Sequence, residues 1–214
     1  MQEISAEDQC RRCWPVDERL DRTFREIWTE LSRGAVDRHH GFHVASLATR
    51  GLDDAPRARS VVLRHVDADP RVIRCHTDRR SGKIAEIARD ARVSWLFYAA
   101  ECKVQIRVSA HAEIVAEGTI PDEAWARTGL SSRRAYLAPR TPGASCDAPS
   151  PNLPAHMLGR RPDEGESETG RAHFAVVSTR AYAIDWLFLA SDGHQRARFV
   201  RADDGVWSGS WVEP

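Results

Sequence analysis

The sequence lacks several features that would assign it to a class at once. It has no run of the roughly 20 apolar residues needed to span a bilayer, and its first residues are polar, without an apolar signal-peptide core. Its 31 basic and 31 acidic residues cancel, which argues against wholesale electrostatic capture of nucleic acid or membrane but allows a local cationic pocket. We therefore expect a cytoplasmic protein that binds neither nucleic acid nor membrane.

The common catalytic motifs are also missing. There is no glycine-rich dinucleotide motif, no phosphate-binding P-loop motif and no nucleophile-elbow motif, which excludes the domains that carry them. The five cysteines are odd in number and irregularly spaced, which favours reduced thiols. Cys10 and Cys13 lack a second pair at metal spacing, and no clear ligand completes a site with His39, His40 and His43. We expect no metal site.

The 214 residues suffice for one sizeable core, and we expect a single domain over 1–214. Apolar residues at three- and four-residue steps predict a helix over 17–33 that Gly34 ends, within an N-terminal tail and helix over 1–38. Residues 138–170 are rich in Pro, Gly, Ser and acidic residues, which predicts one long loop.

The rest of the chain is mostly β-rich, with turn residues between short segments. Further helices are predicted at 81–90 and 119–137. The predicted strands are 41–50, 56–66, 70–77, 92–100, 102–117, 172–190, 195–202 and 206–213. Such close spacing favours antiparallel hairpins. A closed or partly closed antiparallel β-barrel with peripheral helices protects the strand edges best, so the predicted fold class is mainly β.

The stretch from Arg59 to Val108 carries most of the chemical information. A Thr-Asp-Arg-Arg-Ser-Gly-Lys loop opens the helix predicted at 81–90, where backbone N–H groups are free to bind an anion. The side chains that suit a phosphate ester here are Arg59, Arg64, Thr77, Arg80, Ser81 and Lys83. On spacing alone, a solvated surface beside a helix start is the more typical interpretation of these residues, because Arg is abundant throughout the chain, and both interpretations stay open.

Three blocks in this stretch, in matching register, resemble one family. They are Arg59-Ser60-Val61-Val62-Leu63-Arg64, His76-Thr77-Asp78-Arg79-Arg80-Ser81-Gly82-Lys83 and Val104-Gln105-Ile106. The chain resembles the FMN-binding split-barrel family of pyridoxamine 5′-phosphate oxidase, and the segment SSRRAYLAPRTPGAS is similar to that of a divergent bacterial subgroup. The resemblance implies an antiparallel Greek-key split β-barrel and a homodimer with FMN in clefts shared by two subunits.

The resemblance also assigns roles to residues. Lys83 and Ser81, with Arg80, would hold the FMN phosphate, and Gln105 would reach the flavin from the partner subunit. The implied FMN-binding residues are Arg59, Ser60, Val61, Val62, Leu63, Arg64, His76, Thr77, Arg80, Ser81, Lys83, Gln105, Phe188 and Arg198. His194 and Arg196 stand where the family has substrate-binding residues, but neither is equivalent to the family's residue. No catalytic acid or base can be named.

Two functions follow as hypotheses. The first is an FMN-dependent oxidoreductase acting on a small molecule, with the flavin supplying hydride or electron transfer. The second is a non-catalytic module that stores flavin or binds haem or F420 on the same barrel. The altered substrate residues, including Arg64 in place of the family's lysine, predict little oxidation of pyridoxamine 5′-phosphate itself.

Overall fold

The computed structural model describes residues 16–214, so Cys10 and Cys13 lie outside the described residues. Its strands are β1 (Val44–Arg50), β2 (Pro56–Asp67), β3 (Val72–Asp78), β4 (Arg92–Ala99), β5 (Val104–Val115), β6 (Phe174–Phe188), β7 (Gln195–Arg201) and β8 (Trp207–Val212). Its helices are α2 (Val16–Val36), α3 (Gly82–Arg89), α4 (Thr119–Arg127), α5 (Leu130–Arg133) and α6 (Glu164–Glu168), with 3-10 turns at Arg134–Leu137, Ala155–Met157 and Thr169–His173.

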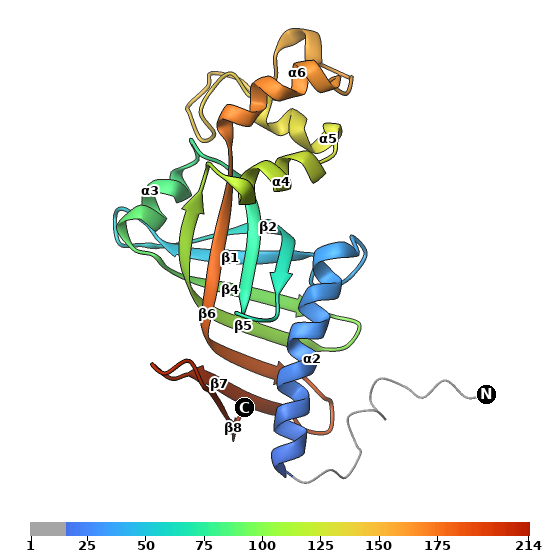
Figure 1. The fold of residues 1–214 in the computed structure, drawn as a ribbon, viewed down its shortest axis with the longest axis vertical. Coiled ribbons are helices and arrows are strands. Elements are labelled where there is room, and N and C mark those ends of the chain that lie inside the picture. The colour runs from blue at the N-terminus through green and yellow to red at the C-terminus, as the bar shows by residue number, and fades with distance from the viewer. Residues whose placement is uncertain (1–15) are drawn as a thin grey trace, which may run out of the picture.

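The strands form a mainly β fold around a closed barrel (Figure 1). All pairs are antiparallel, in the order β3-β2-β1-β4-β5-β6, and β3 also pairs with β6 to close a ring of six strands. Strands β1 to β3 form a meander and β4 returns beside β1, which is the Greek-key order. The predicted fold class and all eight predicted strands are confirmed.

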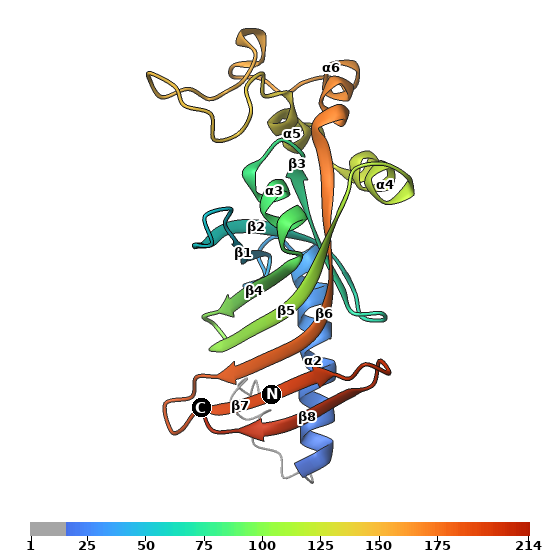
Figure 2. The same cartoon turned by 90° about the vertical axis from the view of Figure 1, so that its left-hand side faces the viewer.

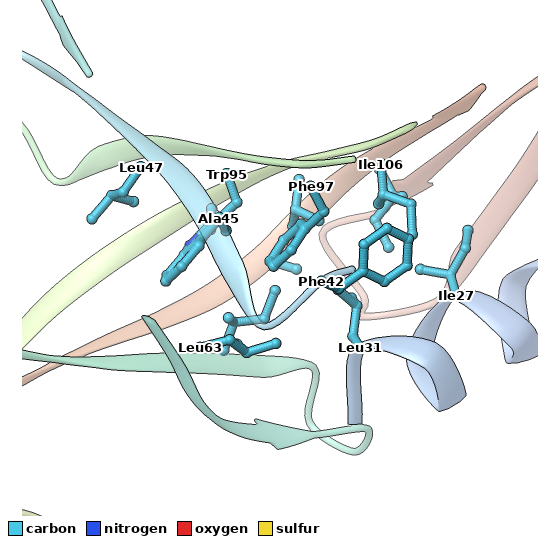
Figure 3. Packing of buried hydrophobic residues seen from close by; sticks show 14 of the residues in the cluster. Ile27, Leu31, Phe42, Ala45, Leu47, Leu63, Trp95, Phe97 and Ile106 are labelled. Carbon is cyan, nitrogen blue, oxygen red and sulfur yellow. The ribbon is translucent and has the colours of Figure 1, made fainter. Parts of the chain in front are cut away.

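The barrel core is apolar and is closed on one side by α2 (Figure 3). Ile27 and Leu31 of this helix pack with Phe97 and Ile106 from the strands and with Phe42 from the turn before β1. The predicted helix exists, but the prediction that Gly34 ends it is wrong, because α2 continues to Val36. Instead, a Cβ atom at position 34 would lie 3.0 Å from the Phe42 side chain, so this glycine allows the helix to approach the turn before β1 closely.

Strands β7 and β8 extend the sheet beyond the barrel and continue along α2 (Figure 2). Residues alternate between two faces of this sheet. The inner face, towards α2, carries Ile106, Trp186 and Phe199, which pack in or against the core. The opposite surface of β4–β8, which we call the outer face, carries polar residues and exposed apolar ones.

The segment between β5 and β6 forms a cap at one end of the barrel (Figures 1 and 2). The helix predicted over 119–137 is broken at Thr128 and Gly129, and the loop predicted over 138–170 contains α6 and a 3-10 turn. Buried Arg133 explains the break, because its guanidinium donates to the carbonyls of Trp125 and Thr128 at the end of α4 and to Glu168.

Within residues 16–214, no helix is long and apolar enough to cross a membrane.

Candidate FMN site

The loop Thr77–Lys83, which we call the phosphate loop, joins the end of β3 to the start of α3. Lys83 Nζ donates to Thr77 Oγ1 and to Ser81 Oγ, each at 2.9 Å, and the two hydroxyl oxygens are 3.1 Å apart. Thr77 and Ser81 are buried. Three of the predicted phosphate-binding side chains therefore meet at one point, although the intervening loop residues point elsewhere.

This cluster fits a phosphate ester. Lys83 has no carboxylate within salt-bridge distance among residues 16–214, and burial is the main cause that lowers the pKa of its ammonium group. Ser81 occupies the N-cap position of α3, but its hydroxyl makes no capping bond to the helix backbone, and the first turn contains no acidic residue. An uncompensated, half-buried ammonium beside free backbone N–H groups is a suitable site for a phosphate dianion.

Two other predicted cations already have carboxylate partners. Arg59 donates to Glu86 at 2.7 Å and to Thr49 Oγ1 at 2.5 Å. Arg80 donates to both oxygens of Asp78, at 3.0 and 2.7 Å, and its Nη2 also bonds to the Ala138 carbonyl at 2.9 Å. These contacts connect the phosphate loop to the barrel and to the cap. The participation of Arg59 and Arg80 in phosphate binding stays a prediction.

His76 lies on the other side of β3 from Thr77, because side chains alternate along a strand. Its ring contacts Phe174 edge-on at 4.8 Å between centroids, and its Nδ1 is 3.5 Å from Thr128 Oγ1 in the cap. Burial, assisted by the charge of Arg64, lowers the pKa of His76 to about 4. The ring is therefore neutral near pH 7 and packs between the barrel and the cap.

Arg64 falls where β2 and β3 lose register, between Leu63 and His65. The Arg64 side chain is exposed, as alternation from buried Leu63 requires. Ser60 and Val62 share the outward direction, whereas Arg59, Val61 and Leu63 face inwards. The first predicted block thus supplies two surfaces of β2 rather than one.

Gln105, Arg196 and Arg198 lie together on the outer face. Strand register places Gln105 opposite Leu187 and Leu187 opposite Arg196, while Arg198 lies opposite Asp185. Sequence reasoning missed Asp185 and Arg107, which also lie opposite each other. Only the alternation of polar and apolar residues in β5 and β6 indicated that both side chains point outwards.

Phe188 lies on the inner face, opposite in direction to Gln105 and Arg198. It lines a cleft of about 510 Å³ between α2 and β5–β8, together with Trp186 and Trp211. Arg19 borders the cleft, bonds to Gln195 and stacks on Trp211, 5.3 Å from the ring centroid. His194 is exposed in the turn before β7. The assignments of Phe188 and His194 stay predictions.

The sequence comparisons agree with this geometry. Residues 25–116 match the family model described as pyridoxamine 5′-phosphate oxidase, FMN-binding domain. Pyridoxine/pyridoxamine 5′-phosphate oxidase 2 from Arabidopsis thaliana is 31% identical over 133 residues, which cover 56% of this chain. The chain belongs to the pyridoxamine 5′-phosphate oxidase-related, FMN-binding family. FMN is accordingly its cofactor, and the Lys83 cluster fits the FMN phosphate.

Solved structures of this family show the same split-barrel fold. An FMN-binding, pyridoxamine 5′-phosphate oxidase-related protein from Nostoc punctiforme superposes with a TM-score of 0.68 at 19% identity, covering 89% of this chain and 96% of its own. PhzG from Burkholderia lata 383, in complex with tetrahydrophenazine-1-carboxylic acid, gives 0.62 at 18% identity, covering 91% and 93%. The chain spans about 66% of the length of the plant oxidase that it matches.

Proposed function

We propose that this protein is an FMN-dependent oxidoreductase that acts on a small molecule. The observation that supports it most is the half-buried Lys83 ammonium, held by Thr77 and Ser81 beside the start of α3 without a carboxylate partner among residues 16–214. Lys83, Ser81 and the first-turn N–H groups would bind the FMN phosphate. Bound flavin supplies hydride or electron transfer, while the protein binds, orients and shields it.

The proposal includes a homodimer that shares the flavin between subunits. Exposed apolar side chains on the outward surfaces of the barrel and sheet support it, since Val44, Leu96, Tyr98 and Val200 are 54%, 41%, 50% and 51% exposed. Apolar groups that gather on one surface commonly mark an interface between chains. A cytoplasmic location also belongs to the proposal, supported by the free thiols of Cys75, Cys102 and Cys146.

Oxidation of pyridoxamine 5′-phosphate itself is a poor match to the candidate substrate residues. Arg196 is engaged by Asp185 through two hydrogen bonds, and His194 is exposed in a turn. We therefore expect a different reductant from pyridoxamine 5′-phosphate.

The test is reduction of the bound flavin. Purified protein loaded with FMN is mixed without oxygen with NADH or NADPH, and separately with pyridoxamine 5′-phosphate, while absorption of the oxidised flavin is followed. We expect bleaching by a nicotinamide and little by pyridoxamine 5′-phosphate. Robust turnover of pyridoxamine 5′-phosphate would contradict the expected substrate.

A second candidate is a non-catalytic flavin-binding module. It is favoured by the same Arg196 and His194 positions, where the family's substrate-binding residues are replaced. Protein that stays fully oxidised with every reductant tested, yet binds FMN tightly, would support storage over catalysis.

A further inference from the structure

Four charged residues form what we call the arginine row on the outer face: Arg107, Asp185, Arg196 and Arg198. Arg107 on β5 and Arg198 on β7 each lie directly opposite Asp185 on β6. Arg196 donates to both carboxylate oxygens of Asp185, at 3.1 and 2.8 Å. Arg107 and Arg198 donate to Asp185 Oδ2, at 3.0 and 3.3 Å. All three guanidinium groups therefore converge on one carboxylate.

The charges of this row do not balance. Within the paired segments 104–109, 183–188 and 195–200, Asp185 is the only acidic residue, so two positive charges remain uncompensated. Burial raises the pKa of the Asp185 carboxyl, but hydrogen bonds from Arg196 and Arg198 outweigh it and keep the pKa below its usual value. Asp185 is thus ionised and already saturated by its partners at neutral pH.

The row also has donors to spare. The Asp185 side chain is only 10% exposed, whereas those of Arg107 and Arg198 are 47% and 56% exposed. Each of these two arginines gives Asp185 one hydrogen bond, out of the five N–H donors of a guanidinium group. The remaining donors face outwards, in a geometry set by their shared carboxylate.

The neighbours of the row are apolar. Leu96 on β4 lies opposite Arg107, and Tyr98 lies opposite Gln105 in the adjacent row. If a second subunit covers this face, the two excess charges leave water, which is costly unless an anion accompanies them. An organic anion would satisfy both the spare N–H donors and the apolar surroundings.

We propose that the arginine row is an anion subsite, and that Asp185 is a positioning residue that orients Arg107, Arg196 and Arg198 towards a small organic substrate bearing a carboxylate or phosphate. This inference rests on the proposed function, because it places the substrate on the face that the dimer would share. The family resemblance assigns no role to Arg107. Its exposed guanidinium would bind the anion directly, whereas Asp185 would act through the arginines.

The experiment is calorimetric titration of FMN-loaded protein with benzoate and, separately, with inorganic phosphate at constant chloride concentration. We expect saturable binding of at least one anion, about tenfold weaker binding in Arg107→Gln, and at least threefold weaker binding in Asp185→Asn. Asp203→Asn is the matched control, since it removes one carboxylate from an exposed turn and should leave affinity unchanged. Comparison of the two probes distinguishes a carboxylate from a phosphate ligand.

The sign of the Asp185→Asn effect decides its role. Asp185→Asn removes a negative charge from the row. Tighter anion binding in this variant would mean that Asp185 only neutralises the arginines, which would overturn the positioning role. Unchanged affinity in Arg107→Gln, or no saturable binding of either anion, would overturn the subsite. If Asp185→Asn loses its FMN absorption or its fold, the subsite is tested by Arg107→Gln alone. Arg107 is half-exposed, so we expect this variant to fold. If FMN-loaded protein binds neither anion, the subsite is wrong but the oxidoreductase proposal is unaffected. If the flavin is not reduced, the oxidoreductase proposal fails but the calorimetric result on anion binding still holds.

Discussion

The phosphate loop and the arginine row both concentrate positive charge, but they are built differently. The phosphate loop takes Thr77, Ser81 and Lys83 from one short stretch, buries the two hydroxyls and leaves its ammonium without a carboxylate among residues 16–214. The arginine row takes its residues from three strands, keeps Arg107 and Arg198 half-exposed and fixes them on a shared carboxylate. A cation that lacks a counter-ion suits a permanently held phosphate, whereas one that is pre-oriented and exposed suits a ligand that exchanges.

The largest expected effect concerns the phosphate loop. Lys83→Ala should weaken FMN binding about ten- to hundredfold, since a charge-assisted hydrogen bond contributes roughly 1.5–3 kcal/mol. The dissociation constant is measured by titrating apoprotein with FMN and following flavin fluorescence. Arg79→Ala is the matched control, because Arg79 is an exposed cation of the same loop. Equal losses in both variants would mean that the loop acts only through its net charge.

The next prediction concerns the outer face. Leu96→Lys should raise the dissociation constant of the dimer about tenfold or more, because it places a cation beside Arg107 and removes apolar area that the proposed dimer would bury. Sedimentation or light scattering over a concentration series measures it. Val206→Lys is the control, since Val206 is 62% exposed and lies between β7 and β8. Monomeric wild-type protein would remove the reason for placing the arginine row at an interface.

A smaller effect is expected at Ser81. Its hydroxyl accepts from Lys83 and contacts Thr77, so Ser81→Ala should weaken FMN binding about two- to tenfold, less than Lys83→Ala because it removes no charge. The same fluorescence titration measures it, and the Lys83→Ala and Ser81→Ala double variant tests coupling. Strictly additive losses would show that the two side chains bind the phosphate independently.

The smallest effect is a pH dependence of stability at the boundary with the cap. The pKa of His76 is about 4 when folded and 6.5 as the reference for the unfolded chain, so the unfolded state binds more protons between these values. Stability from this group is complete above pH 6.5 and is lost as pH falls towards 4, by about 1 kcal/mol between pH 8 and pH 6. Urea unfolding at several pH values measures it. His76→Gln should flatten the profile, while His39→Gln, which changes an exposed histidine, should not.

Sequence reasoning succeeded where the relevant signal is local. The period of apolar residues found α2 and α3, and turn residues separated all eight strands. It failed at Gly34, because this glycine is required by close packing against Phe42, where the chain folds back on α2, and not by a helix end. It failed again over 119–137, where Arg133 satisfies the carbonyls at the end of α4 and so allows the helix to stop.

The sequence by itself indicated the strands and the start of α3, because turn residues and helix-start signals are local. It indicated the cofactor only through the three blocks that resemble the family, since the spacing of Thr77, Ser81 and Lys83 also fits a solvated surface. Tertiary structure alone decided which cations have partners and which surface each side chain occupies. Strand register brought Arg107, Asp185 and Arg198 into one row and turned Phe188 to the opposite face. Register depends on the hydrophobic patterns of both paired strands and on the turns between them, so no single strand specifies it.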